Sequence, residues 1–124
     1  MKVLLSIKPE YAEKILSGEK LYEFRKAIPR ALDAKSCIIY ATMPVGKVVG
    51  EFQIEKYISE SPDDLWNETA NFSGITEEFF RSYFNGRDLA HAIKVKSVKR
   101  YKKAKSLQSV LPSGVAPQSF CYVN

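Results

Sequence analysis

The fold of this chain is decided by residues 6–25, whose sequence is SIKPEYAEKILSGEKLYEFR. Pro9 suits the first turn of a helix, because the N–H group that proline lacks would have no partner there. Apolar residues then recur at helical spacing and form one stripe, and Gly18 is placed to end the helix. The alternating residues 20–26 predict a strand. We therefore expect a short helix that passes directly into a strand.

The sequence on either side of this stretch adds strands and two further helices. Strands are predicted at 2–7, 36–42, 47–58, 89–101 and 119–123, and helices begin after Ser61 and Thr76. Gly50, inside the longest strand, predicts a bulge or a close packing contact. Five or six strands with two or three short helices indicate an α+β, mostly β fold, namely a small mixed β-barrel. At 124 residues, the whole chain 1–124 is expected to form a single domain.

Composition excludes several classes of protein. A hydrophobic fraction of 45% is enough to form a core, so a disordered chain is excluded. The chain has no apolar run of about 18–20 residues, so we expect no membrane partner, and the N-terminal apolar stretch is too short for a signal peptide. One histidine and two distant cysteines, Cys37 and Cys121, do not make a zinc site. We expect no metal, no cofactor, free thiols and a cytoplasmic location.

Charge is distributed very unevenly along the chain. Residues 1–88 hold 12 basic and 14 acidic side chains, whereas residues 89–124 hold seven basic side chains and no acidic one. We call six of them the basic segment: Lys94, Lys96, Lys99, Arg100, Lys102 and Lys103. Lys94, Lys96 and Arg100 are expected on the outer face of the strand, and the others in the following turn. This pattern predicts contacts with a nucleic-acid backbone, and the alternative is a surface that only maintains solubility.

A second charged cluster follows the first helix. Lys20, Glu23 and Arg25 place two positive charges and one negative charge in a small space, which suits the binding of one phosphate or of a base amine. Glu23 and Arg25 share a strand face, but Lys20 has the opposite parity and joins them only if the chain is still turning there. The alternative is a Glu23–Arg25 ion pair that closes the barrel, with Lys20 exposed on the surface.

Three segments taken together resemble a known family. Residues 6–25, which contain Gly18, Lys20, Glu23 and Arg25, are similar to the opening of an ASCH (activating-signal-cointegrator homology) domain, a PUA-like barrel. Residues 74–95 and 116–122 resemble later parts of small ASCH proteins catalogued as predicted transcriptional regulators. The resemblance implies a cleft beside the first helix, binding of RNA or a modified nucleotide, and a role in transcription or translation.

The resemblance also implies two enzymatic alternatives. One branch of the family hydrolyses N4-acetylcytidine with a Lys, a Thr and a Glu, and another has ribonuclease activity. Lys20 matches the Lys of the first branch, but Glu23 stands where that branch has its Thr, which argues against this activity. In a hydrolase, Lys20 would be the activated amine or electrostatic stabiliser, and Glu23 would be the acid or base. A protein-interaction module is the third alternative, and we expect a monomer or weak dimer.

Other residues are weaker candidates. Lys8 stands at the corner between the first strand and the helix, where an anion could bind, and Ser119 would line the same cleft if the last strand lies beside the first. His91 has no evident catalytic partner, so we expect a structural role. Five aromatic residues are expected to close one end of the barrel rather than to stack on bases: Trp66, Phe72, Phe79, Phe80 and Phe84.

Overall fold

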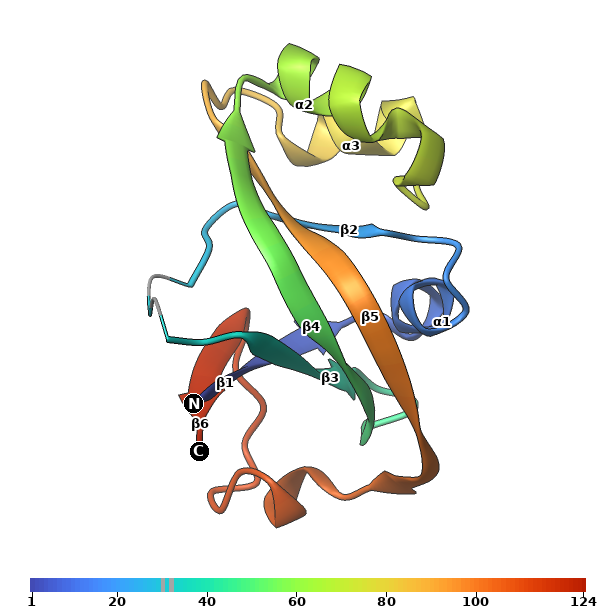
Figure 1. The fold of residues 1–124 in the computed structure, drawn as a ribbon, viewed down its shortest axis with the longest axis vertical. Coiled ribbons are helices and arrows are strands. Elements are labelled where there is room, and N and C mark those ends of the chain that lie inside the picture. Colours follow the sequence, from blue (N-terminus) through green and yellow to red (C-terminus); the bar gives the residue numbers. More distant parts are fainter. Residues whose placement is uncertain (30, 32) are drawn as a thin grey trace.

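The structure is a computed structural model that describes residues 1–29, 31 and 33–124, and it contains one six-stranded mixed sheet (Figure 1). The strands are β1 (Lys2–Ile7), β2 (Tyr22–Arg25), β3 (Ser36–Ala41), β4 (Lys47–Glu60), β5 (Ala90–Lys105) and β6 (Phe120–Val123). Their order in the sheet is β2-β5-β4-β3-β1-β6. β1 and β3 are parallel, and the other neighbouring pairs are antiparallel.

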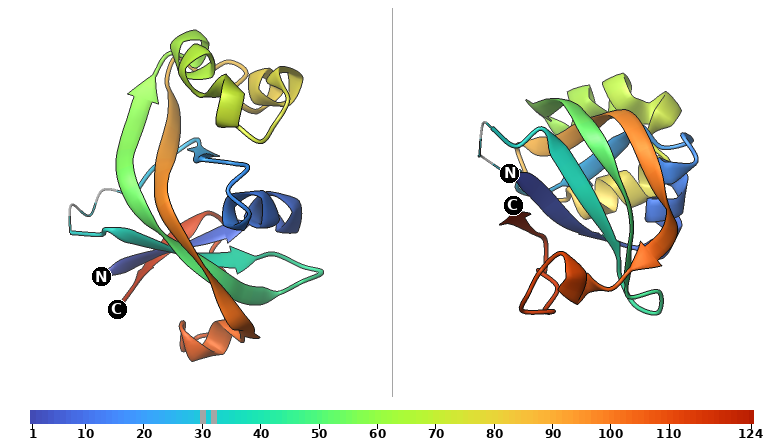
Figure 2. Two further views of the ribbon diagram at one scale, coloured as in Figure 1. Left: turned by 45° about the vertical axis from the view of Figure 1, so that its right-hand side comes forward. Right: turned by 60° about the horizontal axis from the view of Figure 1, so that its bottom comes forward.

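The sheet curls into a barrel whose seam lies between its two edges, β2 and the β1–β6 pair (Figure 2). A side chain bridges this seam. The guanidinium of Arg25 on β2 donates to the carbonyl oxygen of Ser6 on β1 at 2.8 Å and to that of Ser119, just before β6, at 3.3 Å. The predicted mixed barrel is confirmed, and Arg25 holds its edges together.

Three α-helices accompany the sheet: α1 (Pro9–Leu16), α2 (Pro62–Thr69) and α3 (Glu77–Tyr83). Short 3-10 helices follow at Ala70–Phe72 (η1) and Leu107–Ser109 (η2). The predicted caps are confirmed, since the hydroxyl of Ser61 accepts from the N–H of Asp64 and that of Thr76 from the N–H of Phe79. α2 and α3 lie together at one end of the molecule, between the end of β4 and the start of β5 (Figure 1).

Two apolar clusters matter for the site. The barrel interior is filled from β1, β3, α1 and β5, and a second cluster joins β2 to α2 and α3. The predicted role of the aromatic residues in closing this end is confirmed for Phe80 and Phe84, which are buried against Phe24. It is wrong for Phe72 and Phe79, whose exposed fractions are 52% and 38%, because neither side chain belongs to this cluster and Phe79 lies on a different face of α3 from Phe80.

Gly50 has both predicted properties. The pairing of β3 with β4 shifts register beside it, and a Cβ atom at this position would lie 2.6 Å from the carbonyl oxygen of Lys99 and 2.8 Å from Cδ2 of Leu16. Glycine is required here because α1 and β5 approach the β4 backbone too closely for a side chain. The first helix is thereby held against the middle of β5.

The end of β5 differs from the prediction. The predicted strand ends at residue 101, with Lys102 and Lys103 in a following turn, but β5 continues to Lys105, which lies opposite Val48. The polar composition hides this strand, because its side chains face solvent while its backbone pairs with β4. Among the described residues, no helix has the length and apolar character needed to cross a membrane.

Candidate functional site

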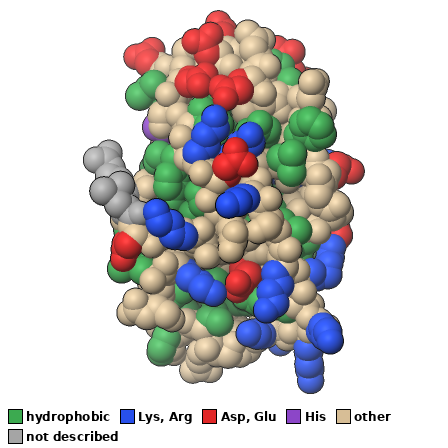
Figure 3. All heavy atoms as spheres, in the orientation of Figure 1, with side chains coloured by type: hydrophobic (Ala, Val, Ile, Leu, Met, Phe, Trp, Pro, Cys, Tyr) green, Lys and Arg blue, Asp and Glu red, His purple; other side chains and the backbone are tan. Residues whose placement is uncertain are grey.

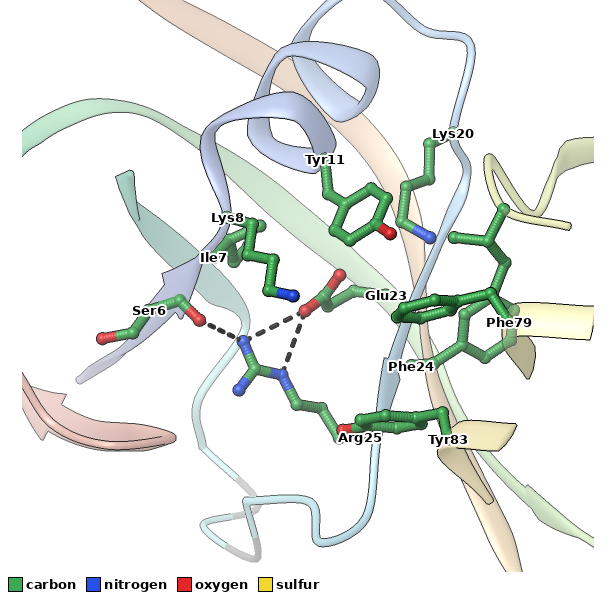
Figure 4. Close-up of a pocket in the computed structure, with 11 residues that line it drawn as sticks. Ser6, Ile7, Lys8, Tyr11, Lys20, Glu23, Phe24, Arg25, Phe79 and Tyr83 are labelled. Carbon is green, nitrogen blue, oxygen red and sulfur yellow. Dashed lines mark hydrogen bonds and ion pairs between the residues drawn. The ribbon is translucent and has the colours of Figure 1, made fainter. Parts of the chain in front are cut away.

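A cavity of about 190 Å³ opens beside the first helix (Figure 4). Its walls come from the end of β1, from α1, from β2 with the residues just before it, and from α3 with the loop before it. The lining residues are Ser6, Ile7, Lys8, Tyr11, Lys20, Glu23, Phe24, Arg25, Ile75, Phe79 and Tyr83. The structure thus brings together four of the five residues predicted to bind a ligand in the cleft.

Lys20 is the most deeply buried charged residue of the pocket, with an exposed fraction of 2%. It precedes β2, so the strand's alternation does not apply to it and its side chain turns into the pocket. Its Nζ donates to the carbonyl oxygen of Ser73 at 2.5 Å and lies 4.7 Å from the ring centroid of Phe24. Burial lowers the pKa of the amine to about 8, although the nearby charge of Glu23 opposes this shift. The Lys20 amine is therefore uncharged in a substantial fraction of the molecules near pH 7.5.

The loop before α3 shapes the place where Lys20 lies. Gly74 has a φ of +70°, and a Cβ atom there would lie within 2.7–2.8 Å of three side-chain carbons of Lys20. Lys14 on α1 donates to the carbonyl oxygen of Gly74 at 3.0 Å and so ties the loop to the helix. The Lys20 side chain is thus confined by backbone that only glycine allows to approach so closely.

Glu23 and Arg25 form a buried ion pair, and each residue has an exposed fraction of 7%. Nε and Nη2 of Arg25 both lie 3.0 Å from Oε2 of Glu23. Nη2 also donates to Ser6, and Nη1 donates to the carbonyl oxygen and hydroxyl of Ser119. No described residue donates to Oε1 of Glu23, and the carboxyl group points into the pocket between Lys8 and Tyr11 (Figure 4). This oxygen is available to a ligand.

The two alternatives posed for this cluster are thus both partly realised. The Glu23–Arg25 ion pair does close the barrel, because the same guanidinium reaches Ser6 and Ser119. Lys20, however, is buried in the pocket rather than exposed on the surface. A structural ion pair and a pocket-lining cluster therefore share the same residues.

Aromatic side chains form the opposite wall, and sequence reasoning did not assign them to the site. Phe79 and Tyr83 are nearly parallel, with an interplanar angle of 11° and centroids 6.2 Å apart, and Tyr11 lies 5.9 Å from Phe79. One signal was available. Phe79 and Tyr83 are four residues apart and so share a helix face, while Phe80 and Phe84 share the neighbouring face that is buried. Because only one of these two aromatic faces of α3 is buried in the core, the other face is expected to pack against a second surface, which here is the pocket.

The remaining predicted residues lie at or beyond the edge of the pocket. Lys8, at the N-cap position of α1, is exposed and lines the pocket. Ser119 is not among the lining residues and instead anchors Arg25, while its carbonyl oxygen also accepts from the N–H of Ser6. His91 lies outside the pocket with Nδ1 2.7 Å from the hydroxyl oxygen of Ser59.

The thiols are not part of the pocket either. Cys37 is buried in the barrel, where burial raises the pKa of its thiol, and Cys121 is half-buried on β6. Within the described ranges, no group of three or more histidine, cysteine or acidic side chains is arranged to hold a metal ion. The chemistry of the pocket is therefore that of an amine, a carboxylate, a guanidinium and aromatic rings.

The basic segment lies on β5 and contributes no residue to the pocket. Two of its members form ion pairs, Lys94 with Glu55 at 3.0 Å and Arg100 with Glu13 of α1 at 2.6 Å. Among the described residues, no carboxylate lies within 4.0 Å of the other four: Lys96, Lys99, Lys102 and Lys103. The cleft and the basic segment are thus separate features of the molecule.

Comparison with known proteins identifies relatives of the whole fold. The chain is 34% identical over 91 residues to an ASCH domain-containing ribonuclease of Zymomonas mobilis, which covers 73% of this chain and 62% of the relative. It is 32% identical over 122 residues to a Ureaplasma parvum protein named ATP synthase subunit alpha, covering 98% of this chain and 15% of that protein. The chain therefore spans less than two thirds of the length of either of these curated relatives.

The structural comparison agrees. The crystal structure of ASCH from Zymomonas mobilis superposes with a TM-score of 0.90 at 30% identity, covering 99% of this chain and 87% of that one. A sequence profile of the ASCH domain matches residues 5–99, which include the end of β1, all of α1 and β2, and all the residues that line the pocket. This chain belongs to the ASCH domain family.

Proposed function

We propose that the chain acts as one domain that binds RNA or a modified nucleotide, with a single base held in the pocket beside α1. The observation that carries this proposal is the composition of one cavity. Amine and guanidinium groups, a carboxylate with an available oxygen, and a wall of aromatic rings converge within about 190 Å³. Small-molecule sites have this character, being mostly apolar with a few convergent polar groups.

The size of the cavity suits one base rather than a whole nucleotide. Pockets for drug-sized ligands have volumes of about 300–1,000 Å³, which is larger than this cavity. A base that is turned out of its strand would stack on Phe79 and donate an N–H group to Oε1 of Glu23. Its phosphate would remain at the mouth, where Lys8 is exposed. The printed name of the Zymomonas mobilis relative, a ribonuclease, supports RNA as the class of ligand.

The test is a titration of nucleoside monophosphates and short RNA at fixed salt. Phe79→Ala should weaken binding between about 5-fold and 150-fold, because stacking on one base contributes about 1–3 kcal/mol. Phe72→Ala is the matched control, since Phe72 is also exposed but does not line the pocket. Equal affinities of the two variants for every ligand would contradict the proposal.

Hydrolysis of RNA or of a nucleoside-like amide is the second candidate function, and the state of Lys20 favours it. A buried amine with a pKa of about 8 is partly neutral near pH 7.5 and can accept a proton from an attacking hydroxyl or water. Incubation with labelled RNA and with acetylated cytidine tests this candidate. Product that is formed by the wild type and lost in Lys20→Met would establish it, and the absence of product from both substrates would reject it.

The cellular setting belongs to the same proposal. We infer a reducing, cytoplasmic location and a role in transcription or translation, acting as a monomer or weak dimer. Both described cysteines are free thiols, and the rise in the pKa of Cys37 on burial keeps it unreactive. Light scattering of the purified protein tests the oligomeric state. Co-purification of a protein partner after nuclease treatment would favour the interaction-module alternative instead.

A further inference from the structure

We propose that the outer half of β5 is a second RNA contact, which binds the phosphate backbone of the same strand whose base occupies the pocket. This inference rests on the proposed function and extends it from a nucleotide to a single strand of several nucleotides. The residues that carry it are Lys96, Lys99, Lys102 and Lys103, which we call the β5 lysines. They are exposed on a strand of 16 residues that continues well past the pocket.

The first argument is that no described carboxylate forms a salt bridge with the β5 lysines, although Lys99 lies opposite Glu51 and helps to lower the pKa of that carboxyl group. Three carboxylates near this part of β5 are already engaged: Glu55 with Lys94, Glu13 with Arg100, and Glu51 with Lys2 and the hydroxyl of Tyr101. A surface that serves only solubility has charges of both signs interspersed. The β5 lysines instead leave an excess of positive charge along the outer half of one strand, to which a phosphate backbone can bind.

The second argument is the shape of this surface. Lys96 and Lys103 are seven residues apart on an extended strand, which corresponds to about 23 Å at about 3.3 Å per residue. One strand of a nucleic-acid helix carries one phosphate per about 3.4 Å of helix axis, so this length matches about seven phosphates at most. Figure 3 shows lysine and arginine side chains gathered over the lower half of the face formed by β4 and β5.

The third argument is that the β5 lysines begin beside the pocket. The N–H of Val95 donates to the carbonyl oxygen of Leu21 at 2.9 Å, so the two segments are paired at this point. Lys96 directly follows Val95, and the pocket residue Lys20 directly precedes Leu21. α1 lies over the same part of β5, held by the Glu13–Arg100 pair. An RNA strand that enters past Lys8, at the N-terminal end of α1, and leaves the pocket at the C-terminal end of this helix would run toward the β5 lysines.

The opposite direction is electrostatically unfavourable. The end of the molecule formed by α2 and α3 carries six acidic residues: Glu60, Asp63, Asp64, Glu68, Glu77 and Glu78. Arg81 pairs with Asp63 and Glu77, and Lys56 pairs with Glu68, so the excess of negative charge comes from the other three. Repulsion between these carboxylates and phosphates disfavours a strand that runs toward α2. The pocket, the β5 lysines and the acidic end together predict one direction for the bound strand, from the pocket toward the lower end of β5.

The test compares a ligand that reaches only the pocket with one that reaches both surfaces. A nucleoside monophosphate and a labelled 12-nucleotide single-stranded RNA are titrated at several salt concentrations. The variant is Lys102→Gln/Lys103→Gln, which lies outside the pocket lining. The control is Lys35→Gln/Lys56→Gln, which also removes two positive charges. One lies just before β3 and the other beside Glu68.

The expected result is specific to the long ligand. Loss of two phosphate contacts should reduce the salt slope for the 12-nucleotide RNA by about 1.4 and weaken binding roughly tenfold at 0.1 M salt. Binding of the monophosphate should not change, and the control should behave like the wild type. If the test and control variants have the same slope while Phe79→Ala still weakens binding, this inference is wrong and the pocket proposal stands. If the wild type binds neither ligand, the proposed function itself fails.

Discussion

Positive charges are buried in the pocket but exposed on the outer half of β5. Lys20 and Arg25 have exposed fractions below 10%, and every Arg25 nitrogen has a protein acceptor. The β5 lysines are exposed, and no described carboxylate lies within salt-bridge distance of them. Burial makes a charge costly unless it is paired, whereas water screens an exposed charge. The first group should therefore control stability and recognition, and the second only salt-dependent binding.

The largest difference should appear when one arginine is removed from each region. Arg25→Met leaves the Glu23 carboxylate buried without its partner and opens the barrel seam, so we expect a loss of about 3–5 kcal/mol in the free energy of unfolding. Arg100→Met breaks an ion pair on the surface, and no measurable change is expected. Urea unfolding at pH 7 measures both variants.

The double variant Glu23→Gln/Arg25→Met separates the two causes of this loss. It should recover part of the stability, because no unpaired carboxylate remains in the seam. Equal losses for Arg25→Met and Arg100→Met would show that the seam is not held by Arg25, and the contrast between buried and exposed charges would fail.

A second difference should appear in the pH dependence of stability. The pKa of Lys20 is about 8 in the folded protein and 10.5 for a lysine in the unfolded chain, so the unfolded chain binds more protons between these values and stability rises with pH. We expect Lys20 to contribute a gain of about 2 kcal/mol between pH 7.5 and 9.5, which the raised pKa of the buried Cys37 thiol partly offsets, because this thiol ionises first in the unfolded chain. Above pH 10 the raised pKa values of Tyr11 and Tyr83 act in the opposite direction, because these tyrosines ionise first in the unfolded chain.

The matched variants for this measurement are Lys20→Met and Lys102→Met. Lys20→Met should remove the rise in stability between pH 7.5 and 9.5, because the titrating buried amine is gone. Lys102→Met should keep it, since Lys102 is exposed. If the wild type and Lys20→Met showed the same change in stability over this interval, the folded protein would not shift the pKa of Lys20.

The smallest difference concerns two glycines near Lys20. Gly74 and Gly18 both have positive φ, +70° and +87°, but only Gly74 would bring a Cβ atom within 3 Å of the Lys20 side chain. Gly18→Ala should cost about 1 kcal/mol for the backbone alone. Gly74→Ala should cost about 1–2 kcal/mol more and should weaken nucleotide binding, because it displaces Lys20. Thermal unfolding and the monophosphate titration measure these effects, and equal results for the two variants would show that the loop does not confine Lys20.

Much of the fold could be predicted from local patterns. Pro9 and Gly18 mark the ends of α1, and the Ser61 and Thr76 hydroxyls begin α2 and α3, because caps depend on residues only a few positions apart. The end of β5 could not be predicted in the same way. Its lysines are typical of a turn, but the strand continues because its backbone pairs with β4, which is distant in the sequence.

The site was predictable only in part, and the reason is the same. The sequence by itself determined the family, the order of the elements and the residue types of the cluster Lys20, Glu23 and Arg25. Only the tertiary structure decided that Lys20 is buried against Ser73, that Phe79 and Tyr83 face the cluster, and that Ser119 anchors Arg25. These contacts join residues from about 50 to about 95 positions apart. A periodic pattern reports only near neighbours on one element, whereas burial and pKa depend on the elements that pack against it.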